Sequence, residues 1–146
     1  MKRCVIMPLG SLGGTLGECA YGFADKAAER GVEYWLLPSL GENYISAIDP
    51  ELLSYDGLVT AAEINRVKKD KSARHAVLKK AFSRFWKPDS YAEFEKANKD
   101  ACADDYELFL RYEFSMQYDA LVSYALSRGV TVVNALPDNT VTVFFD

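Results

Sequence analysis

The 146-residue sequence has no long hydrophobic run, only three cysteines and a single histidine. Without about 18 consecutive apolar residues, no membrane-spanning helix is expected. Cys4, Cys19 and Cys102 lack C-x-x-C spacing, and their odd number favours reduced thiols in a cytoplasmic protein over a disulfide framework. No group of His, Cys, Asp or Glu has the spacing of metal ligands, so neither a metal nor a cofactor is expected.

The composition is that of a chain that folds around one core. Hydrophobic residues make up 49% of the sequence and aromatic residues 13%, which disfavours disorder. The length suits a single domain over residues 1–146. The net charge of −4 gives no general attraction for nucleic acid or for an acidic membrane surface, so neither is expected as a partner.

A strand–helix–strand unit is predicted near the start of the chain. Buried strands are predicted over residues 4–8 and over residues 32–38, which contain the continuous apolar run Tyr34-Trp35-Leu36-Leu37, and a helix is predicted between them over residues 18–30. Such a crossover places its two strands parallel, and strands without polar alternation are covered on both faces. The glycines within residues 9–17 fit neither G-x-G-x-x-G nor a P-loop, so a tight turn is favoured over a phosphate site.

The rest of the chain is predicted to be mostly helical. Thr60 and Glu63 have the spacing of a capping box, and a third buried strand is predicted over residues 130–136. A short turn then leads to a last strand, residues 141–145, which is therefore expected to run antiparallel to the third. The helices are predicted over residues 50–55, from residue 60, over 71–86, from residue 89 or 90, and over 104–128.

Two neighbouring stretches carry opposite charges. Residues 66–87 are rich in Lys and Arg, and residues 89–119 are rich in Asp and Glu. The basic stretch is compatible with an acidic partner, but solvated helix faces that complement each other are favoured. His75 has no evident catalytic partner and is expected to be exposed to solvent. Trp35 and Trp86 are compatible with stacking on sugar rings, although packing in the core is favoured.

A series of short motifs extends over nearly the whole chain, and together they resemble the amylomaltases, or 4-alpha-glucanotransferases. The order of the motifs is the order in that family. The motifs are PLGSLGGTLGE at residues 8–18 followed by Ala20-Tyr21-Gly22-Phe23, GVEYWLLP at 31–38, Asn43-Tyr44 with Ile48-Asp49, Leu52-Leu53 with Gly57-Leu58, LKKAFSRF at 78–85, YEFSMQYDAL at 112–121, Tyr124-Ala125, and Arg128-Gly129-Val130.

The resemblance implies a fold and an activity. The family has a (β/α)₈ barrel with its catalytic residues at the carboxyl ends of the strands. It transfers alpha-1,4-glucan segments through a covalent intermediate on an Asp nucleophile, with a Glu as acid/base. Those residues come from the fourth strand onward, whereas this sequence matches the first three strands. Four residues are candidates for binding: Ser11 and Tyr44, which lie in the matching motifs, Ser39, which follows the second predicted strand, and Asn134, which lies near the end of the third. No catalytic residue is expected.

Two departures from the family pattern argue against catalysis. The long loop after the second strand, which lines the sugar cleft in the family, is reduced to a few residues between Pro38 and Asn43. After the third strand the family has Gly-Asp-Ile-Pro, and here the acid is replaced by Ala135. Glycosyl chemistry needs two acids across a cleft, and Asp146 is the only acid at the end of a predicted strand.

The predicted fold class is α/β. It consists of a small, mostly parallel sheet of three barrel-like strands plus an antiparallel strand, packed with helices, as in part of a TIM barrel. Three strands cannot close a barrel, so the open face is expected to be covered by the last strand, by the helix over residues 71–86, or by a second copy of the chain.

The expected function is binding without catalysis. A protein partner, including a second copy, is favoured, and an alpha-glucan is possible. One alternative is that the chain is one part of a split 4-alpha-glucanotransferase, with the remainder on another polypeptide. Another alternative is a small inhibitor-type interaction protein that uses the charge-separated helices as its surface.

Overall fold

The computed structural model describes residues 1–145. Contacts between residues divide the chain into two compact units. Unit 1 comprises residues 1–48 and the chain from residue 116 onward, and unit 2 comprises residues 49–115. The prediction of a single domain over residues 1–146 stays a prediction.

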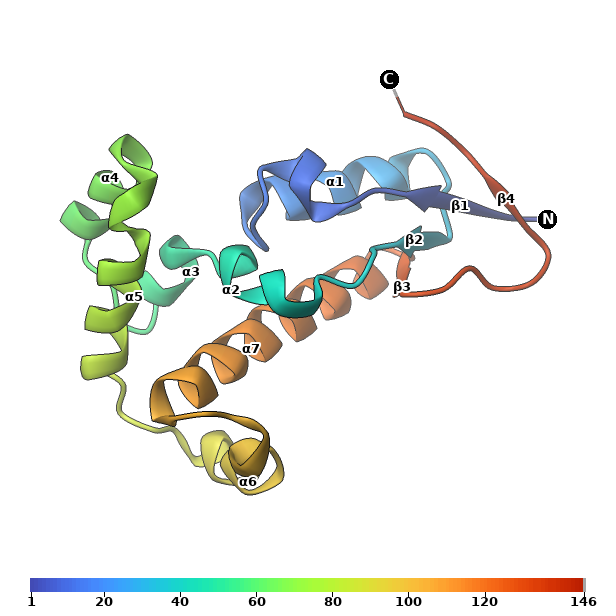
Figure 1. The fold of residues 1–146 in the computed structure, drawn as a ribbon. Coiled ribbons are helices and arrows are strands. Elements are labelled where there is room, and N and C mark those ends of the chain that lie inside the picture. Colours follow the sequence, from blue (N-terminus) through green and yellow to red (C-terminus); the bar gives the residue numbers. More distant parts are fainter. Residues whose placement is uncertain (146) are drawn as a thin grey trace. The chain divides into compact units, whose positions relative to one another are not determined.

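Unit 1 is built on a parallel sheet with the strand order β3-β2-β1-β4 (Figure 1). The strands are β1 (Lys2–Ile6), β2 (Tyr34–Leu36), β3 (Thr131–Val133) and β4 (Thr140–Thr142). All three adjacent pairs are parallel. The three barrel-like strands therefore lie side by side in one sheet, as the sequence predicts.

Helix α1 (Glu18–Glu29) covers one face of this sheet. The Phe23 ring of α1 lies 4.9 Å from the Trp35 ring of β2, edge to face, and Trp35 is fully buried. The Trp35 indole nitrogen also donates a 3.0 Å hydrogen bond to the carbonyl of Met7, at the end of β1. Trp35 therefore joins both central strands to the helix that crosses between them.

Glycines end both long helices of unit 1 in the same way. Gly31 follows α1 with a φ of 72°, and Val32 donates a 3.0 Å hydrogen bond back to the Ala27 carbonyl. Gly129 follows α7 (Asp105–Ser127) with a φ of 87°. A left-handed residue with a bond from the next residue to an earlier carbonyl is a Schellman motif, which glycine adopts without steric penalty.

The face of the sheet opposite α1 is partly bare. Side chains alternate along a strand, so Lys2, Ile6 and Tyr34 lie on the face that Trp35 does not occupy. Lys2 Nζ donates a 3.2 Å hydrogen bond to the Tyr34 hydroxyl on this face, and Ile6 is 45% exposed. Parallel sheets are normally covered on both faces, so this exposure is unusual for the fold.

The prediction of an antiparallel last strand is wrong. β4 pairs parallel with β1 at the far edge of the sheet, through Lys2–Thr140, Arg3–Val141 and Cys4–Thr142. A short turn gives an antiparallel hairpin only when the two strands become neighbours. Here residues 134–139 instead carry the chain back past β2 and β1, as the red segment in Figure 1 shows. The turn residues therefore do not form a hairpin turn.

Unit 2 is helical. Its first helix is capped as predicted, because the Asp49 carboxylate accepts a 3.0 Å hydrogen bond from the Glu51 amide. The elements of unit 2 are α3 (Pro50–Ser54), α4 (Ala61–Lys69), η3 (Lys71–Ala73), α5 (Arg74–Ser83), α6 (Asp89–Asn98), η4 (Lys99–Ala101) and the first part of α7.

A cluster of aromatic rings forms part of the core of unit 2. The Phe85 ring lies 5.0 Å from Tyr91 and 4.9 Å from Phe109, both edge to face. Tyr112 packs 5.1 Å from Tyr91, and its hydroxyl shares a 2.6 Å hydrogen bond with Ser90. Trp86 does not join this core, because it is 63% exposed. The prediction that Trp86 packs inside is therefore wrong, whereas the same prediction for Trp35 is confirmed.

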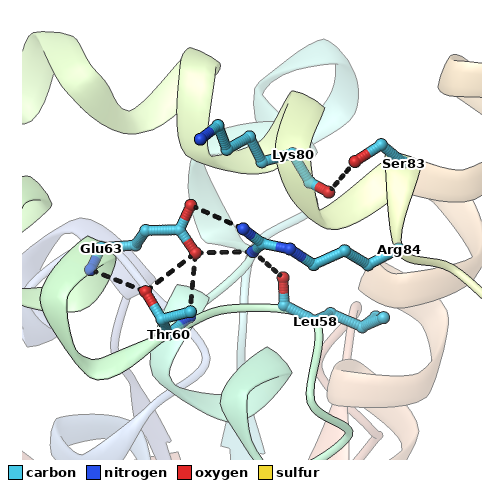
Figure 2. A network of polar contacts seen from close by, with 6 residues as sticks. All are labelled: Leu58, Thr60, Glu63, Lys80, Ser83 and Arg84. Atoms are coloured by element: carbon cyan, nitrogen blue, oxygen red, sulfur yellow. Dashed lines mark hydrogen bonds and ion pairs between the residues drawn. The ribbon is translucent and has the colours of Figure 1, made fainter.

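A polar network fixes the start of α4 (Figure 2). Thr60 and Glu63 form the predicted capping box, with a 2.9 Å hydrogen bond from the Thr60 amide to Glu63 and a 3.2 Å bond from the Glu63 amide to Thr60. Arg84, which follows α5, donates to the Glu63 carboxylate at 2.6 Å and to the Leu58 carbonyl at 2.9 Å. The hydrogen bond from Arg84 is the main reason that the pKa of Glu63 falls to about 2.

Candidate functional site at the carboxyl edge of the sheet

The candidate site is the carboxyl edge of the parallel sheet in unit 1. In parallel α/β folds, ligands bind where the strands end, on the loops that follow them. Three of the four predicted binding residues follow adjacent strands here: Ser11 follows β1, Ser39 follows β2 and Asn134 follows β3. The strand order thus places these three residues along one edge, and their role in binding stays a prediction.

Ser11 lies in a turn that is held mainly by hydrogen bonds between its own backbone groups. It belongs to the 3₁₀ helix η1 (Leu9–Leu12), and its amide donates a 3.1 Å hydrogen bond to the Pro8 carbonyl. The Gly14 amide donates to Leu9 at 2.9 Å, and the Leu16 amide donates to Ala47 at 2.8 Å. These three amides already donate to carbonyls of the chain, so they are not free to bind a phosphate. The bonds agree with the predicted tight turn between strand and helix.

Ser39 and Asn134 lie just beyond the last ladder bonds of the sheet. The Met7 amide donates to Leu36 at 3.2 Å, and the Leu37 amide donates to Val133 at 2.9 Å. The side chains of Ser11, Ser39 and Asn134 are exposed, and none has a hydrogen bond to another residue within 1–145. Two hydroxyls and an amide are thus left to bind a polar ligand.

Tyr44 differs from the other three candidates because it is buried. It begins helix α2 (Tyr44–Ala47), which follows the 3₁₀ helix η2 (Gly41–Asn43), and it is 7% exposed. Its ring therefore packs inside unit 1 and presents little surface to a ligand at this edge. A binding role for Tyr44 also stays a prediction.

This edge offers hydrogen bonds and little acid–base chemistry. The described segments between each strand and the next α-helix or strand carry two carboxylates, and both are exposed. Glu42 lies in η2 at this edge, whereas Asp138 lies next to Asn139, whose carbonyl bonds to Lys2 at the start of β1, and so belongs to the opposite edge. A retaining or inverting glycosidase mechanism needs a second carboxyl group within about 5–9.5 Å. Asp146, the acid noted at the end of the last predicted strand, lies outside the described residues.

The described residues were also compared with the requirements of a metal site and of a membrane-spanning helix. No three His, Cys, Asp or Glu side chains in residues 1–145 are grouped as metal ligands would be. No helix in the same range combines the length and apolar character needed to cross a bilayer. Cys4 is buried, Cys102 is half-buried and Cys19 is exposed, and all three are free thiols.

Sequence reasoning missed one unusual titratable group in unit 2. Glu113 is 5% exposed on α7, and its carboxyl group has no hydrogen bond or ion pair to any residue within 1–145. Burial, with a smaller contribution from the nearby Asp56 carboxylate, raises its pKa to about 7. Its position between Tyr112 and Phe114 in a broadly apolar helix was the signal that could have identified it.

A comparison with solved structures finds a protein of similar fold. The chain superposes on an amylomaltase from Streptococcus agalactiae, solved in complex with acarbose, with a TM-score of 0.71 and 19% sequence identity. The match covers 90% of this chain and 42% of the amylomaltase chain. This chain has the fold of part of an amylomaltase. No protein-family model and no curated protein matches the sequence.

The match agrees with the parallel sheet described above. It explains why helix α1 covers one face and the other is partly bare, since the inner face of a barrel is normally closed by the remaining strands. The chain spans less than half the length of the amylomaltase that it matches.

Proposed function

We propose that this chain is a non-catalytic, amylomaltase-like interaction module that acts by binding a protein partner. One observation carries the proposal: the carboxyl edge of its sheet has exposed, unpartnered polar groups at Ser11, Ser39 and Asn134. Of the two carboxylates on the described segments that follow the strands, Glu42 lies at this edge and Asp138 lies near the opposite one. Such an edge suits recognition better than glycosyl transfer, which requires paired acids. The partly bare face of the sheet supports a protein partner, because exposed apolar surface favours association.

The test is a glucan-transfer assay on the purified chain. Maltotriose is incubated with the chain, and the products are separated by chromatography. Transfer between two maltotriose molecules would give glucose and maltopentaose, or maltose and maltotetraose. The proposal expects maltotriose to be recovered unchanged, and new oligosaccharides would contradict it. An alpha-glucan as a bound ligand is tested in the same samples, by titration calorimetry with maltotriose.

A second candidate is one part of a split 4-alpha-glucanotransferase. The observation that favours it is the coverage, since this chain matches 42% of an amylomaltase chain. A polypeptide carrying the remaining strands of a barrel would then restore transfer when it is added to this chain. Transfer that requires both polypeptides supports this candidate, and transfer by the added polypeptide alone counts against it.

We also place the protein in the cytoplasm. The support is the set of free thiols, including the exposed Cys19, because free exposed thiols are typical of reducing compartments. Fractionation of cells followed by immunodetection tests this placement.

A further inference from the structure

The segment that contains β4 is an arm with its own receptor surface. Residues 140–145, called the β4 arm below, pair with β1 at three positions. The Val143 amide adds a 2.8 Å hydrogen bond to the Cys4 carbonyl. Beyond the strand, Phe145 packs 5.5 Å from the Phe23 ring, and the Arg30 guanidinium lies 4.6 Å from the Phe145 ring centre. The arm thus binds a surface formed by β1 and the helix α1.

The connection to this arm, residues 134–139, is only slightly longer than the distance that it must span. β3 and β4 lie at opposite edges of the sheet, three strand spacings or about 14 Å apart. Val133 is level with Ile6, whereas Thr140 is level with Lys2, so the two ends also differ by about 13 Å along the strands. The direct path is therefore about 19 Å, and the seven residue steps from Val133 to Thr140 reach at most about 24 Å.

The connection ends in a residue with a left-handed backbone. Asn139, the last residue before β4, has a φ of 59°, a conformation that asparagine adopts more readily than most residues other than glycine. Its carbonyl accepts a 3.1 Å hydrogen bond from the Lys2 amide, so this conformation is tied to the position of the arm. Residues 134–139 are mostly exposed. A short, taut and exposed connection is the usual hinge of domain swapping.

We infer that a second copy of this chain is a partner, through exchange of the β4 arms. In the dimer, residues 140–145 of each copy pair with β1 and pack on α1 of the other copy. Every contact of the arm is kept, because the receptor surface is the same in both copies. Only residues 134–139 change conformation, and they no longer have to turn back across the sheet. This inference goes beyond the proposed function, because the arm contacts β1 and α1 and involves none of the carboxyl-edge residues Ser11, Ser39 and Asn134.

The first test measures the molar mass of the purified chain by light scattering over a range of concentrations. A dimer of twice the 16.3 kDa chain mass is expected, in slow exchange with the monomer. Inserting four Gly or Ser residues after Ala135 gives the closed form slack and is expected to lower the dimer association constant by about tenfold or more. Deleting Ala135 and Leu136 leaves a reach of about 17 Å, too short for the closed form, and is expected to give only dimer.

The second test identifies the exchanged arm directly. Arg3 and Val141 are register partners, and neighbouring strands bring Cα atoms within the range of about 4.4–6.8 Å that a disulfide spans. The single variants R3C and V141C, each in a background of C4A, C19S and C102A, are unfolded together, refolded and oxidised. A disulfide between the two different chains is expected. The control mixes R3C with L126C, because Leu126 on α7 is 60% exposed and lies outside the arm.

The outcomes separate this inference from the proposed function. A chain that stays monomeric at all concentrations, with no R3C–V141C cross-link, overturns the exchange, even if the deletion variant fails to fold. A dimer without that cross-link also overturns it, because some other surface then joins the copies. Neither result bears on glucan transfer. An exchanged dimer that transfers glucan would instead keep the inference and overturn the proposed function.

Discussion

The Tyr124 hydroxyl donates a 2.7 Å hydrogen bond to Asp25 Oδ1, joining α7 to α1 across 99 positions of the sequence. Arg128 donates to the same oxygen at 2.8 Å, and the Tyr21 ring lies 4.9 Å from the Tyr124 ring. The hydrogen bond from Tyr124 is the main reason that the pKa of Asp25 lies below its ordinary value of 3.8. This contact holds together the two helices that pack on the sheet of unit 1.

Removing this contact is expected to destabilise the chain in a pH-dependent way. A carboxyl group whose pKa is lowered on folding stabilises the fold above its ordinary pKa, and the effect is lost as the pH falls through the lowered value. The variant Y124F should therefore unfold at a lower urea concentration than the parent at pH 6, and the difference should shrink below about pH 4. A difference that is independent of pH would show that Tyr124 acts through packing alone.

Glu113 should give the opposite pH dependence. Its pKa is about 7 in the folded chain, raised from 4.5, so the folded chain holds the proton more tightly than the unfolded chain. The contribution of Glu113 to stability is then greatest below pH 4.5 and is lost as the pH rises through 7. The variant E113Q should raise the free energy of unfolding by about 2–3 kcal/mol at pH 8 and change it little at pH 5.

The control for this prediction is E93Q, which changes an exposed carboxylate on α6. Because Glu93 is exposed, E93Q should change the free energy of unfolding at pH 8 by less than about 0.5 kcal/mol. If E113Q is no more stable than the parent at pH 8, ionising Glu113 does not lower the free energy of unfolding. That result would show that its carboxyl group reaches water in solution, and it would contradict the burial described above.

The capping network of α4 predicts a loss of stability that acid abolishes. The variant T60A removes the side-chain oxygen that accepts from the Glu63 amide, and it should cost about 1 kcal/mol at pH 7. The variant E63Q weakens the pairing with Arg84, and its effect should shrink as the pH falls from 4.5 to about 2, because Glu63 of the parent is increasingly protonated over this range. Urea unfolding of both variants across this range checks the prediction. An effect of E63Q that is as large at pH 2 as at pH 7 would contradict it.

The two tryptophans should respond very differently to the same substitution. The variant W35F removes a fully buried side chain and its 3.0 Å hydrogen bond to Met7, and it should cost about 2–3 kcal/mol. The variant W86F changes a side chain that is 63% exposed and should alter stability by less than about 0.5 kcal/mol. W86F also leaves Trp35 as the sole tryptophan, so its fluorescence reports the unfolding of unit 1. Equal losses in the two variants would contradict the fold described here.

Most of the fold follows from local signals in the sequence. The capping box at Thr60, the cap at Asp49 and the helix-ending glycines Gly31 and Gly129 all act within a few residues, so their effects are readable from spacing. The buried strand around Trp35 was predictable because a parallel strand covered on both faces is continuously apolar. These features do not depend on how distant parts of the chain meet.

The features that sequence could not give depend on distant contacts. The direction of β4 is set by its pairing with β1, more than 130 positions earlier in the chain, and nothing in residues 137–145 distinguishes that pairing from a hairpin. The same holds for Trp86, whose exposure is decided by how α5 ends against its neighbours. At the candidate site, the positions of Ser11, Ser39 and Asn134 follow from strand order, whereas the burial of Tyr44 reflects packing around α2.

The most direct test of the proposed function is the conversion of maltotriose by the purified chain, with an active amylomaltase as positive control. Binding without catalysis predicts that maltotriose is recovered unchanged after an incubation in which the control enzyme reaches equilibrium. Glucose and maltopentaose formed by this chain alone would contradict that conclusion, since they require glycosyl transfer.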